Sequence, residues 1–328
     1  MRIRALLLAI VLGTSIFSYP AHAANQLTVG VAYDIGGRGD KSFNDASAAG
    51  LDKAQKEIDF KLEAVVTDGS SVDREKRIRS LITKNCNPII AIGAGYAPTL
   101  QALAVEFPNT QFAIINDASV AALNVTSVVF ANTQGAYLAG FSAAQVSKTG
   151  KVAMIANPDQ ADMYKDGFSA GVFASKKKVI PIVKYVSGSY SVATSQVLDA
   201  GADIVFVATQ GSDSEVFKVI VARNAKKKSA KIGLINIEPD QYITVTNASK
   251  RFLLATVVKR VDKAIYDVIA LSSTQKQYLD ILDGDAGIYG RRYGITGGGI
   301  EFTIRSKDLA GVSDLINVAA ATAEKIPA

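Results

Sequence analysis

The sequence contains almost no cysteine or histidine, and each shortage excludes a class of metal, redox or catalytic site. Cys86 is the only cysteine among 328 residues, which excludes an internal disulfide and a Cys-x-x-Cys metal or redox site. His22 is the only histidine, and it lies in a segment expected to be cleaved off, so the commonest general base and metal ligand is missing. We therefore expect no metal, no cofactor and no catalytic residue, and we interpret Cys86 as a small buried hydrophobe.

Long apolar runs are absent beyond the N-terminal segment. Arg2 and Arg4 precede an apolar run at 5–17 and the A-x-A pattern at 21–23, which predicts a signal peptide at 1–23. Removing those 23 of the 328 residues leaves 305 and lowers the formal net charge from +6 to +4. No later run approaches the roughly 18 to 20 residues of a membrane helix, and no cysteine follows the signal to carry a lipid anchor. We expect a mildly basic protein that is periplasmic or secreted.

Apolar strand patterns alternate with helix patterns along the rest of the chain. Strands are predicted at 27–32, 60–66, 89–93, 112–116, 151–156, 180–186, 204–208 and 232–237. Helices are predicted between them at 72–83, 98–107, 161–174, 193–200 and 214–225. Continuous Val, Ile and Ala runs between helices are typical of parallel sheets covered on both faces. This order predicts an α/β protein with two such sheets.

The most informative segment is 29–50, where a strand pattern meets a glycine turn and a helix start. Ser42 is a candidate N-cap, which places Phe43 and Asn44 in the first turn of the helix. A phenyl face there can stack on a flat ring, and the amide can pair with the edge of a heterocycle. A plainer interpretation makes Phe43 a hydrophobic staple of the helix start. Because parallel sheets bind ligands beyond the carboxyl ends of their strands, two facing lobes predict a ligand cleft.

A weak internal repeat supports two related lobes. Shifting the chain by 121 residues aligns FNDASAAG at 43–50 with YKDGFSAG at 164–171. Two helices rich in Ala and Gly can also give such a match by chance. If the repeat is real, Phe43 and Tyr164 hold equivalent places in the two lobes.

A series of sequence blocks is more specific than any single motif. The blocks are Asp34, DKSFN at 40–44 with Gly50, PIIAIGAGY at 88–96, VEFPNTQFAIIND at 105–117, FANTQGAYLAGFSAA at 130–144, GADIVFVATQG at 201–211, EPDQ at 238–241 and TVVKRVDKAIYD at 256–267. In this order they resemble the basic membrane protein (PnrA-like) family of ABC-importer substrate-binding proteins, several of which bind purine nucleosides. The resemblance covers essentially the whole mature chain.

The resemblance implies a type I periplasmic-binding-protein fold. Two doubly wound parallel-sheet lobes are then joined by a three-crossing hinge and close on the ligand. Lobe one is expected to hold residues 25–133 plus 253–278. Lobe two is expected to hold residues 134–252 plus 279–328.

The resemblance also implies a set of ligand-binding residues. On the base side, Phe43 and Tyr190 would cover opposite faces of the ring, with Asp34 and Asn44 as polar contacts. On the ribose side the matching residues are Gly211, Glu238 and Lys259, with Asp117 as a further candidate. Glu238 stands where the family has aspartate, so either Glu238 or Asp240 would contact the sugar.

The implied function is that of an extracytoplasmic receptor. It would bind a nucleoside, a purine one in the first place, and deliver it as a monomer to the permease of an ABC importer. The lysine runs at 176–178 and 226–228 are interpreted as solvated helix ends, so no nucleic acid partner is expected. One alternative is a receptor for a sugar or a signal molecule on the same fold. Another is an exported nucleoside-processing enzyme, which lacks the histidine or Asp-rich metal motif that hydrolysis would need.

Overall fold

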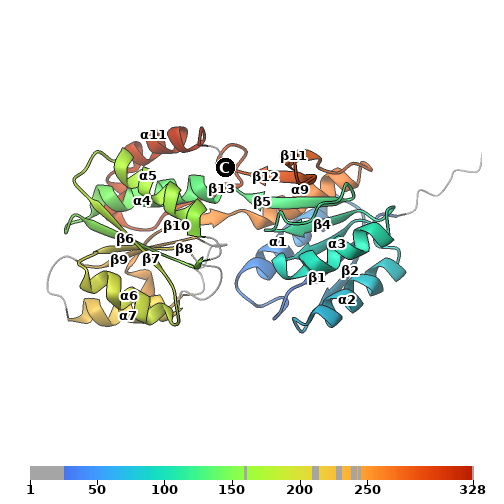
Figure 1. The fold of residues 1–328 in the computed structure, drawn as a ribbon, viewed down its shortest axis with the longest axis horizontal. Helices are drawn as coiled ribbons and strands as arrows, with labels where there is room; N and C mark the ends of the chain where they lie inside the picture. Colours follow the sequence, from blue (N-terminus) through green and yellow to red (C-terminus); the bar gives the residue numbers. More distant parts are fainter. Residues whose placement is uncertain are drawn as a thin grey trace, which may run out of the picture.

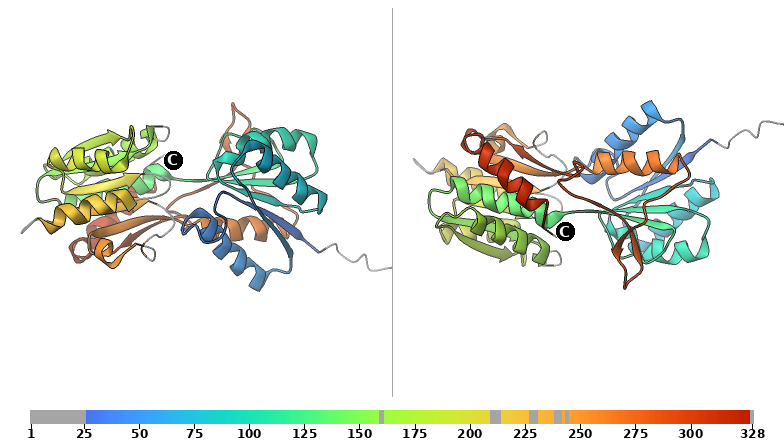
Figure 2. Two further views of the ribbon diagram at one scale, coloured as in Figure 1. Left: turned by 90° about the horizontal axis from the view of Figure 1, so that it is seen from below. Right: turned by 90° about the horizontal axis from the view of Figure 1, so that it is seen from above.

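The computed structural model describes residues 26–158, 161–208, 214–226, 231–237, 242 and 245–326. These residues form two α/β lobes side by side (Figures 1 and 2). The expected signal peptide lies outside the described residues. Within them, no helix combines the length and the apolar character required to cross a bilayer.

The first lobe is built on a seven-stranded sheet in the order β11-β12-β5-β4-β3-β1-β2. Its strands are β1 (Thr28–Tyr33), β2 (Lys61–Val66), β3 (Ile89–Ile92), β4 (Phe112–Ile115), β5 (Val125–Phe130), β11 (Asp280–Asp283) and β12 (Ile288–Tyr293). Its helices are α1 (Phe43–Glu57), α2 (Ser71–Thr83), the short η1 (Ala94–Tyr96), α3 (Ala97–Glu106) and α9 (Val261–Ser272). All neighbouring strands are parallel except β11 and β12.

Alternation along the strands explains why helices cover both faces of this sheet. In β3, Ile90 and Ile92 belong to the core that contains α1 and α9, whereas Ile89 and Ala91 belong to the core that contains α2 and α3. Successive side chains of a strand point to opposite faces, so a fully apolar strand needs cover on both sides. The continuous apolar runs of the sequence have this cause.

The second lobe is built on a six-stranded sheet in the order β13-β10-β9-β8-β6-β7. Its strands are β6 (Lys151–Ala156), β7 (Ile180–Tyr185), β8 (Ile204–Ala208), β9 (Gly233–Ile237), β10 (Leu253–Lys259) and β13 (Ile300–Ile304), of which only β13 is antiparallel to its neighbour. Its helices are α4 (Asn132–Val146), α5 (Ala161–Ala174), α6 (Tyr190–Asp199), α7 (Ser214–Ala225), α8 (Asn247–Lys250), α10 (Lys307–Ala310) and α11 (Ser313–Ala323).

Glycine sets the distance between α4 and α5. A Cβ added to Gly140 would lie 2.1 Å from the carbonyl oxygen of Phe168, and one added to Gly171 would lie 2.0 Å from that of Tyr137. Neither position has room for a side chain, so the two helix backbones touch directly. This packing holds the start of α5, with Tyr164, in a fixed place.

Three crossings join the lobes, as the family resemblance implies. The chain crosses between β5 and α4, between β10 and α9, and between β12 and β13. The crossings are hydrogen-bonded to one another: the Ala131 N–H donates to Tyr293 O at 2.8 Å, and the Arg260 N–H donates to Gly299 O at 3.0 Å. Together they form a single hinge region.

The C-terminal part of the chain is divided between the two lobes at other positions than expected. Residues 253–278 were expected in lobe one, but β10 pairs with β9 and β13 and belongs to the second sheet, while α9 packs on α1 in the first lobe. Residues 279–328 were expected in lobe two, but β12 pairs with β5 in the first sheet. Every residue of β10 is buried, as expected for a strand that is paired on both sides within the second sheet.

Candidate ligand site

The carboxyl ends of the parallel strands carry the polar residues of both lobes. In the first lobe, Asp34 follows β1 and Asp117 follows β4 shortly after its end. In the second lobe, Asn157 follows β6, Tyr190 opens α6 after β7, and Lys259 ends β10. Loops at this edge carry the ligand contacts of parallel α/β sheets. The candidate site therefore lies where the two carboxyl edges meet.

Lys259 lies at the junction of the two lobes. Its side chain is only 2% exposed, and its Nζ donates to the Tyr164 hydroxyl at 3.1 Å. The same nitrogen lies 5.7 Å from the ring centroid of Phe43, which belongs to the other lobe. A buried ammonium normally requires strong hydrogen bonds or a counter-charge. Among the described residues the Tyr164 hydroxyl is its recorded hydrogen-bond partner, and no carboxylate forms an ion pair with it.

Phe43 is placed by the loop before α1. Ser42 occupies the N-cap position, but its side chain makes no capping hydrogen bond. The Asp40 carboxylate satisfies the first turn instead, by accepting from the N–H groups of Ser42, Asn44 and Asp45 at 2.8, 3.0 and 3.1 Å. A carboxylate at this end also complements the helix dipole. The half-buried Phe43 ring is therefore held at a well-braced helix start.

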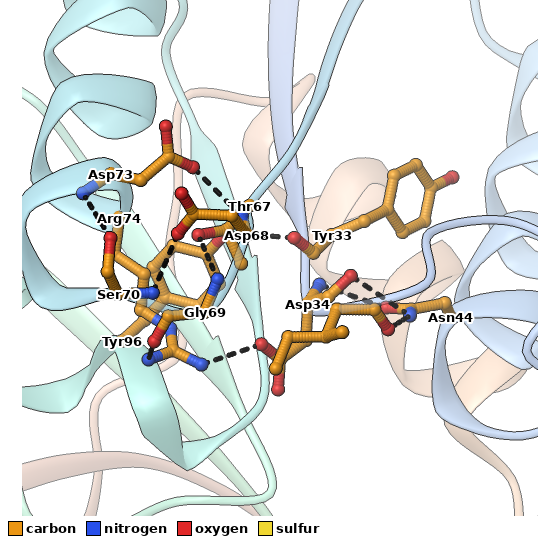
Figure 3. Close-up of polar contacts among 11 residues, drawn as sticks. Tyr33, Asp34, Asn44, Thr67, Asp68, Gly69, Ser70, Asp73, Arg74 and Tyr96 are labelled. Atoms are coloured by element: carbon orange, nitrogen blue, oxygen red, sulfur yellow. Dashed lines mark hydrogen bonds and ion pairs between the residues drawn. The ribbon is translucent and has the colours of Figure 1, made fainter.

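A second polar cluster surrounds Asp34 at the same edge (Figure 3). Arg74 Nη2 forms an ion pair with Asp34 Oδ1 at 2.8 Å. The guanidinium also lies 5.5 Å from the ring centroid of the fully buried Tyr96, whose hydroxyl donates to Tyr33 O at 2.8 Å. Burial raises the pKa of the Tyr96 phenol, and the charge of Asp34 raises it further, so the phenol stays a donor.

One carboxylate oxygen of Asp34 is available to another partner. Oδ2 accepts no hydrogen bond from the described residues, while Oδ1 accepts one from Arg74. Gly93, with φ of 100°, lies against this oxygen, and a Cβ there would come within 3.2 Å of it. The glycine therefore keeps the carboxylate accessible, in a backbone conformation that other residues rarely adopt.

Comparisons with known proteins identify the family of the chain. The profile of the family described as "ABC transporter substrate-binding protein PnrA-like" matches residues 27–317. The chain belongs to this family. Members are ABC substrate-binding proteins, which bind a small molecule outside the cytoplasm and partner with a membrane permease, and they are not classed as enzymes.

Two distant relatives match about three quarters of this chain. A "CD4+ T-cell-stimulating antigen" of Listeria innocua is 29% identical over 75% of this chain and 73% of its own. An "ABC transporter nucleoside-binding protein BmpA" of Lactococcus lactis is 27% identical over 74% of each chain. The structure of an ABC transporter solute-binding protein from Aeropyrum pernix matches with a TM-score of 0.65, over 91% of this chain and 86% of that one, at 20% identity. This likeness confirms the type I periplasmic-binding-protein fold.

The side chain of Asn44, an expected ligand contact, is hydrogen-bonded within the protein. Its side chain is 2% exposed, and its Oδ1 accepts from the Asp34 N–H at 3.1 Å. Its Nδ2 donates to the carbonyl oxygens of Asp34 and Ile35, both at 3.3 Å. Both amide donors are therefore used within the protein. In this structure Asn44 braces the loop that carries Asp34 and offers no free donor to a heterocycle.

We expect Asn44→Ala to destabilise the protein. The substitution leaves three backbone groups of residues 34 and 35 without their partner, at a cost of about 1–3 kcal/mol in the free energy of unfolding. Urea denaturation of the apo protein measures this loss. Full retention of stability would instead point to a role confined to ligand contact.

Tyr190 is fixed by its hydroxyl. It opens α6, with Ser189 as N-cap, and its hydroxyl donates to Asn157 Oδ1 at 2.5 Å. This bond joins the loops after β6 and β7 and holds the half-buried ring at the carboxyl edge of the second sheet.

Asp117 is engaged locally. Its Oδ1 accepts from the N–H and the hydroxyl of Ser119 at 2.8 and 2.7 Å. Its Oδ2 has no recorded partner among the described residues. The preceding Asn116 has a φ of 65°, an uncommon value that turns the chain at the end of β4. Asp117 therefore lies at the edge with one oxygen unused.

The remaining expected contacts are not placed. Gly211 and Glu238, together with Asp240, lie outside the described residues. Conversely, the structure adds Tyr164, Arg74, Tyr96 and Asn157 to the site region. The internal repeat pointed to Tyr164, but no pattern in the sequence marked Arg74 or Asn157. Within the described part of the chain, no group of His, Cys, Asp and Glu side chains could hold a metal ion.

Proposed function

We propose that this protein is a nucleoside receptor that takes a purine nucleoside between its lobes. One observation carries the proposal: the buried Lys259 ammonium lies between the Phe43 ring of one lobe and the Tyr164 hydroxyl of the other. An aromatic face beside a strong donor suits a ligand that has a flat ring and hydroxyl groups in one molecule. The name of the Lactococcus lactis relative supports the same class of ligand.

The two halves of a nucleoside would use different parts of the site. The base would stack on Phe43, with Tyr190 approaching from the second lobe and Asp34 Oδ2 accepting from an edge N–H. The sugar hydroxyls would accept from Lys259. Gly211, Glu238 and Asp117 remain candidates for further ribose contacts. A purine offers more ring area than a pyrimidine, so stacking and apolar burial favour it.

Ligand binding would draw the lobes together about the three crossings. The closed form joins surfaces of both lobes, and only this form would engage the permease productively. The mature protein would act outside the cytoplasm, after cleavage near residue 23. The nucleoside leaves chemically unchanged.

Calorimetric titration tests the ligand class. Adenosine, guanosine and inosine are expected to bind more tightly than cytidine and uridine, while free bases and ribose bind far more weakly than nucleosides. Chromatography of the same mixtures should recover intact nucleoside, and released base would support the enzyme alternative. Tight binding of ribose or another sugar alone would favour a sugar receptor.

The Tyr190 hydroxyl and ring can be tested separately. Tyr190→Phe keeps the ring but removes the hydrogen bond to Asn157, so we expect a loss of nucleoside affinity below about threefold. Tyr190→Ala removes the ring as well and should weaken binding by about tenfold or more. Equal affinities for the Ala variant and the wild type would reject a role for this ring in the ligand site.

A further inference from the structure

A second concave site lies at the opposite edge of the second sheet. It is a cavity of about 550 Å³ at the starts of β8, β9 and β10, where Ile204, Gly233 and Leu253 line it. Leu253 and Lys259 are the two ends of the seven-residue strand β10. At 3.3 Å per residue, the strand separates this cavity from the nucleoside site by about 20 Å. The two sites are therefore distinct.

Cations dominate the lining of this cavity. Among the described residues the lining cations are Lys148, Lys231, Lys250, Arg251, Arg305 and Lys307, against the carboxylates Asp203 and Asp308. Both oxygens of the buried Asp203 are engaged locally, by Ser147 Oγ at 2.7 Å and by the N–H groups of Lys148 and Thr149 at 2.6 and 3.1 Å. Its charge is stabilised by this turn. The cavity therefore presents a positive field, which attracts anions.

The inner wall is apolar. It is formed by Val146, Ile204, Ile232, Phe252, Leu253 and Leu254. Beside it, the ring of Tyr242 carries two of the lining cations: Lys250 Nζ lies 4.8 Å from the ring centroid and Arg305 Cζ 4.4 Å. A cation beside an aromatic ring is attracted to the ring face, so Tyr242 helps to fix the positions of both side chains. The cavity thus combines apolar lining residues with several positive charges.

We propose that this cavity binds a small organic anion whose phosphate or carboxylate group is attached to an apolar body. The charged group would lie among Lys148, Lys250 and Lys307, and the apolar body against Phe252 and Leu254. The volume lies within the roughly 300–1,000 Å³ of small-molecule sites and leaves space beyond an inorganic anion. The headgroup of an anionic lipid has the same chemistry, so the test must separate a free anion from a lipid surface.

Three probes separate the contributions of charge and apolar body. Calorimetry of the full chain with 1-naphthyl phosphate should give one saturable site, whereas inorganic phosphate and neutral 1-naphthol should each bind at least about tenfold more weakly. Added salt should weaken the binding of 1-naphthyl phosphate. Vesicles with and without phosphatidylglycerol form the second arm, and binding to anionic vesicles without binding of the free probe would overturn the proposal.

Matched double variants locate the site. Lys148→Gln with Lys307→Gln removes two exposed lining charges and should weaken 1-naphthyl phosphate by about fivefold or more. Lys56→Gln with Lys276→Gln removes two exposed lysines of the first lobe and should change affinity by less than about twofold. Melting temperatures confirm that both pairs fold. Equal losses of affinity in the two double variants, or displacement of 1-naphthyl phosphate by inosine, would overturn the assignment. The test does not depend on nucleoside binding, because it compares the affinity of the two double variants for 1-naphthyl phosphate.

Discussion

Replacing Phe43 by alanine is expected to weaken nucleoside binding by at least about tenfold, which is about 1.4 kcal/mol of binding free energy. The ring lies at the start of α1 with its face toward the Lys259 ammonium, 5.7 Å from the ring centroid. A stacked aromatic pair is worth roughly 0.5–1.5 kcal/mol beyond the apolar area that it buries. Loss of both terms together gives the expected reduction, which calorimetric titration measures.

Stability should change little in the same variant. The Phe43 ring is only partly buried at the edge of the core, so its removal should cost the apo protein about 1 kcal/mol, or roughly 2–4 °C in melting temperature. Phe43→Tyr keeps the ring and should keep most of the affinity. Phe107→Ala, which removes another half-buried ring of the first lobe at the end of α3, serves as the matched control. It should lower the melting temperature without lowering affinity. Unchanged affinity of the Phe43→Ala variant would mean that Phe43 only packs as a hydrophobic staple at the start of α1.

Most of the alternating strands and helices were predictable from local pattern. The expected strand at 112–116 is β4 (Phe112–Ile115), and the expected helix at 161–174 is α5 (Ala161–Ala174). Such segments are short, apolar and bounded by turns, and these features depend only on near neighbours. The hydrophobic pattern does not identify a helix that is buried on all sides, because such a helix has no polar face. In α4 every residue from Gln134 to Ala144 is buried, so no polar face marked it as a helix.

Long-range pairing was not predictable in the same way. Whether β10 belongs to the first or the second sheet depends on its pairing with the preceding strand β9 and with the later strand β13, and no local sequence pattern identifies these partners. A chain that crosses three times between lobes gives no local signal of where each crossing lies. The family resemblance implied the number of crossings, and the structure supplies their positions.

In the candidate site, too, some residues could be predicted from the sequence and others could not. Asp34 was implied only by the family resemblance, whereas Phe43, in the first turn of α1, could be proposed from position and chemistry. The role of Asn44 could not, because an amide in that place can face either a ligand or its own loop, and hydrogen bonds to residues 34 and 35 decide it. Arg74 lies within α2, forty residues after its partner Asp34, and only the fold brings them together.

Lys259→Met is expected to move binding and stability in opposite directions. Hydrogen bonds from a charged donor contribute about 1.5–3 kcal/mol, so loss of the ammonium should weaken nucleoside binding by about 10- to 100-fold. The apo protein should keep or gain stability, because a side chain that is 2% exposed then no longer carries a desolvated charge. Methionine fills a similar volume and tolerates an irregular cavity. Calorimetry measures the affinity, and urea denaturation measures the free energy of unfolding.

Tyr164→Phe is the matched control, because it removes the hydroxyl that accepts from Lys259 at 3.1 Å and leaves the ammonium in place. A buried charge that loses its hydrogen-bond partner is costly, so this variant should lower the stability of the apo protein by about 1–3 kcal/mol. Nucleoside affinity should fall less than in Lys259→Met, since the ligand hydroxyls can take over the released donor. If Lys259→Met instead lost stability and affinity in parallel, the lysine would be a structural link between the lobes and not a ligand contact. The expected signs are opposite because the buried Lys259 ammonium has the Tyr164 hydroxyl as its hydrogen-bond acceptor in the structure, and a bound nucleoside would supply further acceptors.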